Sequence, residues 1–109
     1  MRQAQFFIGA DNGTSKVDQA KIVQLVSEHF GGGTIISATG IWQGKTEPSV
    51  VVIVGHNVSA GYLQRFCLLL CDELKQDAVG FSDGQNFRLV TIDDIPEHYA
   101  DSNVTGFQS

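Results

Sequence analysis

Apolar side chains in the first third of the chain change from strand-like to helix-like spacing. Residues 6–10 form a short apolar run that is followed by a turn signal and predicts a first strand. Residues 16–30 carry apolar side chains on one broad face and polar side chains opposite, which predicts an amphipathic helix. We expect Thr14 or Ser15 to cap this helix at its start and the three glycines at 31–33 to end it.

The next segment predicts two strands joined by a tight turn. Residues 34–42 are rich in β-branched side chains, and residues 43–46 have the composition of a hairpin turn. Residues 49–56 predict the following strand. We expect Pro48 near the start of that strand, because proline lacks the N–H that a ladder hydrogen bond requires.

A second helix and two further strands complete the pattern. We expect Asn57 or Ser59 to cap this helix and Lys75 to lie at its end. Residues 78–82 and 86–92 predict strands that flank a hairpin signal. The helix is predicted by a regular apolar stripe, which consists of Leu63, Phe66, Cys67, Leu70 and Leu74.

This element order predicts an α+β fold. The first six elements match the ferredoxin-like β-α-β-β-α-β two-layer sandwich, in which two helices cover one face of an antiparallel sheet. The added C-terminal strand would extend one edge of the sheet. The 109 residues therefore predict a single domain over residues 1–95, followed by a polar C-terminal tail over residues 96–109.

The third predicted strand is apolar on both of its faces. Between Val50 and Val54 there is no polar alternation, although a strand with one face in water should alternate. We therefore expect the second sheet face to be buried as well. A homo-oligomer, either a dimer or a trimer, would bury it by packing open faces together, and the alternative is that the tail folds over it.

The topology also predicts which strand ends lie close together. The first two strands end, and the third and fourth begin, on the same rim of the sheet. That rim would gather a carboxylate, an indole, an amide and several glycines, and it is where we expect a site. Its residues are Gly9, Ala10, Asp11, Thr39, Gly40, Trp42, Glu47, Gln76 and Asp77, together with the start of the first helix.

Charge and composition narrow the classes of partner. Seven Lys and Arg against twelve Asp and Glu give a net charge of −5, which argues against nucleic acid as a partner. No apolar run is long enough for export or to span a membrane, so we expect a cytoplasmic protein.

The familiar catalytic and metal-binding motifs are missing from the sequence. Cys67 and Cys71 lie inside an apolar helical stripe, without further ligands nearby, so we interpret them as buried free thiols. The histidines at 29, 56 and 98 form no spaced cluster. We expect no metal and no cofactor.

One hairpin carries candidate chemistry. Glu47 lies beside the apolar run that we expect to form an interface, where a carboxylate needs a cationic partner. Trp42, on the same hairpin, could offer its ring face to a cation. The simpler interpretation, a solvated glutamate and an aromatic plug, is also open from the residues alone.

At these residues the sequence resembles the small phage-encoded S-adenosylmethionine lyases, formerly called hydrolases. One shared pattern is Thr-Gly-x-aromatic, a hairpin, and then a glutamate before a valine strand, here Thr39-Gly40-Ile41-Trp42 and Glu47-Pro48-Ser49-Val50. The other is Gln76-Asp77-Ala78-Val79, where the helix gives way to the fourth strand. The family has a tyrosine where this chain has Trp42, which removes a phenolic hydroxyl, and the hairpin is shorter here.

The resemblance implies a PII-like trimer with active sites between subunits. It implies cleavage of S-adenosylmethionine to methylthioadenosine and homoserine lactone, or to homoserine if water attacks, and depletion of the host's methyl donor in the host cytoplasm. Glu47 would be the essential carboxylate. We expect the substrate-binding residues to be Trp42, Thr39, Gly40, Ser49, Gln76 and Asp77. The alternatives are a non-enzymatic PII-like nucleotide binder and a protein that binds a host partner.

Overall fold

The computed structural model of the chain describes residues 1–11 and 13–92. The expected polar tail, residues 96–109, and the last residues of the expected domain lie outside the described residues. The elements in chain order are β1 (Arg2–Ile8), α1 (Gln19–Phe30), β2 (Thr34–Trp42), β3 (Lys45–His56), α2 (Ala60–Glu73), β4 (Ala78–Ser82) and β5 (Phe87–Thr91). Among the described residues, no helix is both long enough and apolar enough to cross a membrane.

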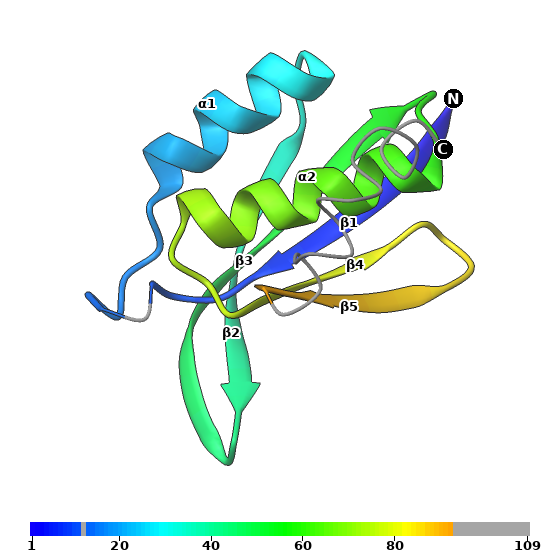
Figure 1. The fold of residues 1–109 in the computed structure, drawn as a ribbon. Helices are drawn as coiled ribbons and strands as arrows, with labels where there is room; N and C mark the ends of the chain where they lie inside the picture. Colours follow the sequence, from blue (N-terminus) through cyan, green and yellow to red (C-terminus); the bar gives the residue numbers. More distant parts are fainter. Residues whose placement is uncertain (12, 93–109) are drawn as a thin grey trace.

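The five strands form one antiparallel sheet in the order β2-β3-β1-β4-β5. The two helices lie on the same side of this sheet, and the described residues leave its other face open (Figure 1). The predicted ferredoxin-like sandwich is therefore confirmed, and β5 extends the β4 edge as expected.

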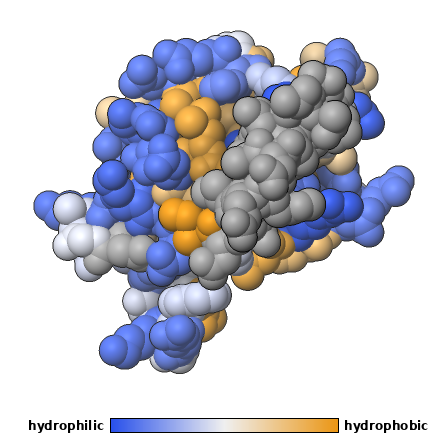
Figure 2. All heavy atoms as spheres, viewed as in Figure 1, coloured by the Kyte–Doolittle hydropathy of each residue, from blue (hydrophilic) through white to orange (hydrophobic). Residues whose placement is uncertain are grey.

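The core lies between the sheet and the helices. Alternate residues of β1, namely Ala4, Phe6 and Ile8, are buried and point toward the helices. Phe6 packs edge-on against Phe66 of α2, with 5.1 Å between ring centroids. On the side seen in Figure 2, hydrophilic residues cover most of the described surface and a narrower hydrophobic band shows among them.

The boundaries at the start of the chain differ from the predicted ones. β1 begins at Arg2 rather than at residue 6, because alternate residues from Ala4 onward are buried even though Gln3 and Gln5 between them are polar. The first helix is capped by Asp18, whose carboxylate accepts from the Lys21 N–H at 3.0 Å, and not by Thr14 or Ser15. Those two residues instead belong to a turn that Asp11 Oδ1 organises by accepting from the N–H groups at 13 and 14.

The β2–β3 hairpin is longer than predicted. Gln43 and Gly44 both have positive φ, 52° and 79°, and form a two-residue turn that lets β3 begin at Lys45. Pro48 therefore lies inside the strand, paired with Thr39. This is tolerated because β1 pairs with β3 only from Val50 onward, so at Pro48 the strand has a ladder on one side only.

The valine run of β3 separates two environments. Val50, Val52 and Val54 are buried under the helices, with exposures of 3% or less. Val51 and Ile53 lie on the open face and are half-buried in the single chain. The expectation that a second copy or the tail covers these two residues stays a prediction.

Candidate functional site

A pocket of about 210 Å³ opens on the uncovered face of the sheet, where β1 ends and the β2–β3 hairpin projects beyond it. Strand register brings its walls together, since Gly40 pairs with Glu47 and Phe7 pairs with both Val51 and Gly80. The lining residues are Phe7, Gly9, Ala10, Gly40, Ile41, Trp42, Glu47, Ser49, Gln76, Asp77, Ala78, Gly80, Phe87 and Leu89. The meeting of these segments at one rim, expected from the topology, is confirmed.

The carboxylate of Glu47 lies directly over the backbone of Gly9. A Cβ placed on Gly9 would overlap Glu47 Oε1 and lie 3.3 Å from its Cδ. The same point is 3.4 Å from Oε1 of Gln76, so two oxygen acceptors converge above this glycine. Within the described part of the chain, the Glu47 carboxylate has no hydrogen bond and no ion pair. It is a charged group, held close to the backbone, that is free to receive a ligand.

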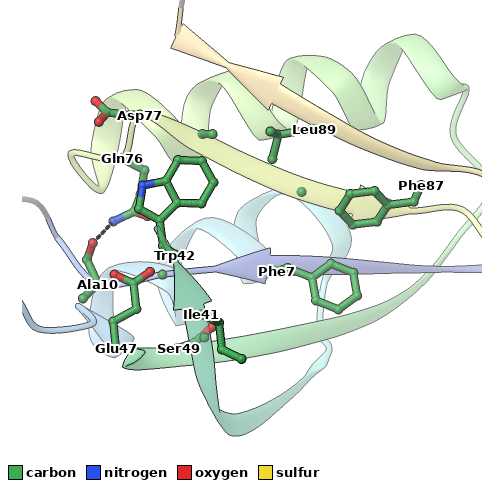
Figure 3. Close-up of a pocket in the computed structure, with 14 residues that line it drawn as sticks. Phe7, Ala10, Ile41, Trp42, Glu47, Ser49, Gln76, Asp77, Phe87 and Leu89 are labelled. Carbon is green, nitrogen blue, oxygen red and sulfur yellow. Dashed lines mark hydrogen bonds between the residues drawn. The ribbon is translucent and has the colours of Figure 1, made fainter. Parts of the chain in front are cut away.

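Gln76 is oriented by its own buried hydrogen bonds. After α2 ends, Lys75 adopts a left-handed φ of 56°, and the Gln76 N–H donates to the Cys71 carbonyl at 2.9 Å. The Gln76 side chain then turns inward, where its Nε2 donates to the Ala10 carbonyl, as the dashed line in Figure 3 marks. Because only the NH₂ group can donate to a carbonyl, this bond fixes the amide and directs Oε1 toward Gly9 and Glu47.

Aromatic rings form the other surfaces of the pocket. Figure 3 shows Trp42, Glu47 and Gln76 gathered at one end, with Phe7 and Phe87 at the other. The indole of Trp42 is 54% exposed in the single chain. Phe87 lies over Gly80, where a Cβ would be 2.7 Å from its ring, and its ring centroid is 5.7 Å from that of Phe7. A flat, apolar group could stack on any of these rings.

The charged residues of the pocket all have the same sign. Glu47 and Asp77 are both carboxylates, and none of the lining residues is a lysine, arginine or histidine. Acidic side chains and exposed aromatic faces both attract cations. The arrangement therefore suits a cationic ligand that also carries an aromatic group.

The predicted site residues take different places. Trp42, Gly40, Glu47, Gln76 and Asp77 line the pocket. Ser49 also lines it, but its hydroxyl donates to the Ile8 carbonyl at 2.9 Å, so what remains for a ligand is its oxygen as an acceptor. Thr39 pairs with Pro48 and not with Glu47, and it lies outside the pocket wall.

The wall of the pocket also differs from the expected set. Asp11 and the start of α1 do not line the pocket. The lining residues that were not predicted are Phe7, Ile41, Ala78, Gly80, Phe87 and Leu89, of which Phe87 and Leu89 come from β5. The signal that could have revealed these two is their alternation with Arg88, which sends Phe87 and Leu89 to the open face.

Other candidate chemistry is scattered over the described residues. Cys67 and Cys71 are both buried, as expected, and neither is in a disulfide. Burial, and after it the neighbouring Cys71 thiol, raises the pKa of Cys67, which keeps it protonated. No group of three or more metal-ligating side chains occurs in the part of the chain that the structure describes. His98 lies outside that part.

Comparison with known proteins gives a structural likeness. No protein-family model matches the sequence, and no curated protein matches it. The chain is similar to a phage SAM lyase in complex with S-methyl-5'-thioadenosine, with a TM-score of 0.62 and 20% identity over 84% of this chain and 89% of that one. It is also similar to a phage SAM lyase in the apo state, with a TM-score of 0.60 and 18% identity over 82% of this chain and 87% of that one. Both of these solved structures are phage SAM lyases, and at 20% identity or less the likeness concerns the fold.

Proposed function

We propose that this chain cleaves S-adenosylmethionine. The observation that carries the proposal is the pocket, which combines two carboxylates with exposed aromatic rings and has no cationic side chain in its wall. S-adenosylmethionine is a cation with both a sulfonium and an ammonium group, and it carries a flat adenine. The likeness of the fold to SAM lyases, one of them in complex with S-methyl-5'-thioadenosine, supports the same substrate class.

The ammonium group of the substrate would bind above Gly9. Oε1 of Glu47 and Oε1 of Gln76 both face this point, and one of them carries a negative charge. Ammonium has three donors, so it can bond to both oxygens at once. Trp42 would cover the sulfonium or the adenine, a contact worth roughly 0.5–2 kcal/mol if it is cation–π in kind.

No lysine, arginine or histidine in the described part of the chain lines the pocket to pair with the substrate's own carboxylate. With its ammonium held by Glu47, the bent chain would bring a carboxylate oxygen to the γ-carbon. That oxygen forms a C–O bond as the C–S bond breaks, and the electron pair leaves on sulfur. The products are methylthioadenosine and homoserine lactone, with no water consumed and no proton moved. Sulfonium is already a good leaving group, so holding this geometry can supply much of the rate enhancement.

A second copy of the chain would complete the site. The pocket of about 210 Å³ is smaller than the roughly 300–1,000 Å³ typical of small-molecule sites. The open sheet face around it carries exposed apolar residues, including Ile36, Phe87 and Leu89, with exposures of 47%, 62% and 51%. Packing these faces together, in a trimer of the kind implied by the sequence resemblance, would enlarge the pocket wall and exclude water.

The biological role that follows is phage counter-defence. An enzyme that destroys the host's methyl donor in the host cytoplasm would starve methyl-dependent restriction. A fall of S-adenosylmethionine in cells that express the chain is the expected sign of this role.

Glu47→Gln tests the site. This change keeps the size of the side chain and removes its charge, so a charge-assisted hydrogen bond of about 1.5–3 kcal/mol is lost. We expect kcat/KM for S-adenosylmethionine to fall by about 10- to 150-fold. The matched control is Glu28→Gln on the exposed side of α1, which should retain full activity. Equal activity of Glu47→Gln and wild type would contradict the assignment of Glu47.

A further inference from the structure

A second pocket, of about 170 Å³, lies at the opposite end of the sheet. Its walls come from the start of β1, the end of β3, the first turn of α2 and the β4–β5 loop. Arg2 pairs with His56 at this end, whereas Ile8 pairs with Val50 next to the first pocket, six residues away along β1. The second pocket is thus separate from the proposed cleavage site and shares no lining residue with it.

One wall of this pocket presents hydrogen-bond donors. Arg2 is anchored because its Nη2 donates to the Val58 carbonyl at 2.6 Å, and its other N–H groups are left available. His56 is only 6% exposed, and its Nδ1 accepts from the Val58 N–H at 3.2 Å. The ring proton therefore sits on Nε2, which is buried and has no partner among the described residues.

The state of the His56 ring and the start of α2 decide which donors this wall offers. Burial, and after it the positive charge of Arg2, lowers the pKa of His56, so at pH 7 the ring offers one neutral N–H donor. Ala60, the first residue of the 14-residue helix α2, also lines the pocket, and backbone N–H groups in a first turn have no partner within the helix. An unpaired buried donor is costly unless something accepts from it. A carboxylate would accept hydrogen bonds from the Arg2 guanidinium, from the His56 Nε2–H and from a backbone N–H in the first turn of α2.

The facing wall is acidic. Asp83 Oδ1 accepts from the backbone N–H groups of Gln85 and Asn86 at 3.0 and 2.9 Å, which holds the carboxylate in place. Arg2 and Asp83 line the same pocket, yet the one salt bridge among the described residues joins Lys21 and Glu73. The pocket therefore holds a positive and a negative group that do not pair with each other.

We propose that this second pocket binds a small apolar α-amino acid. Its carboxylate would bind to Arg2 and His56, and its ammonium to Asp83. Its side chain would lie against the apolar wall that Val58 and Leu63 form. An α-amino acid carries both a carboxylate and an ammonium group, so it can pair with Arg2 and Asp83 at the same time. A simple anion or a simple cation could pair with only one of them. The proposal does not depend on the cleavage of S-adenosylmethionine.

The test is titration of the full chain with L-valine, followed by amide chemical shifts. Two matched probes each lack one charged group: isovalerate has no ammonium, and isobutylamine has no carboxylate. We expect saturable shifts at Val58, Ala60 and Asp83 with L-valine, and binding at least about tenfold weaker with either probe. Equal affinity for either probe, or no saturable shift with L-valine, would overturn the proposal.

Variants then test whether each wall of the pocket contributes to binding. Arg2→Gln and Asp83→Asn should each weaken L-valine binding by about tenfold or more, and the spectra themselves report whether each variant is folded. Asp72→Asn, on the exposed side of α2, is the matched control and should bind as the wild type does. If both pocket variants bind L-valine with unchanged affinity, the ligand does not occupy this pocket and the proposal is wrong.

Discussion

Replacing Gly9 by alanine should move the Glu47 carboxylate without harming the fold. The added Cβ would overlap Glu47 Oε1, the end of a flexible side chain that can swing away. The φ of Gly9 is not positive, so alanine can adopt the same backbone conformation. The change should therefore act on the position of one charge and leave the core intact.

The size of the effect follows from Coulomb's law. Clearing the overlap requires the carboxylate to move by about 1–2 Å, from about 4 Å to about 5–6 Å from a bound ammonium. At an effective dielectric constant of about 20, this weakens the attraction by about 0.8–1.4 kcal/mol. We therefore expect kcat/KM for S-adenosylmethionine to fall by about 4- to 10-fold. The free energy of unfolding should stay level or rise by about 0.4–1 kcal/mol, because alanine restricts the unfolded chain.

The assay pairs initial rates of methylthioadenosine release with urea unfolding. Gly32→Ala is the matched control, since Gly32 has no positive φ and no atom within 4 Å of its Cβ position. The control should keep wild-type rates. Full activity in Gly9→Ala would refute the requirement for a carboxylate above Gly9. Loss of stability in Gly9→Ala would show instead that the glycine serves the fold.

Three further predictions concern other parts of the molecule. The pKa of His56 is lowered in the folded state, so as the pH falls the unfolded chain binds a proton at this residue before the folded chain does. The free energy of unfolding should therefore decrease as the pH drops below 6.5. In urea titrations between pH 7.5 and 5.5, His56→Asn should lose less stability than the wild type. Cys67 and Cys71 are buried and the pKa of Cys67 is raised, so neither thiol should react with a thiol reagent until denaturant is added, and rapid labelling of the native protein would contradict this. Phe87→Glu puts a charge on the open sheet face, so it should convert the proposed oligomer to monomers, which sedimentation would detect. An unchanged oligomer would mean that this face is not the interface.

The fold could be predicted because local signals agree with one another. Gly31 ends α1 in a left-handed conformation with φ 80°, as the glycines at 31–33 suggested. The boundaries that were missed depended on tertiary context. Gln3 and Gln5 conceal the first half of β1, since polar side chains on the open face break the apolar run. Pro48 sits inside β3 only because β1 has already ended beside it, which no local pattern reveals.

The position of the candidate site was predictable as far as the topology decides which ends of the strands and helices lie close together. Trp42, Glu47 and Gln76 come from different elements, and strand direction alone brings them to one rim. The sequence could not reveal how these side chains are oriented. The overlap of Glu47 with Gly9 and the fixed amide of Gln76 depend on side-chain conformations. The role of Phe87 depends on the register between β4 and β5.

The most direct measurement is the product analysis of the purified wild-type chain with S-adenosylmethionine in heavy-oxygen water. We predict methylthioadenosine and homoserine lactone in equal amounts, with no heavy oxygen on the γ-carbon of the lactone, because the substrate's own carboxylate attacks there. Heavy oxygen in a γ-hydroxyl of homoserine would mean that water attacks instead. Intact S-adenosylmethionine after prolonged incubation would contradict the proposed cleavage altogether.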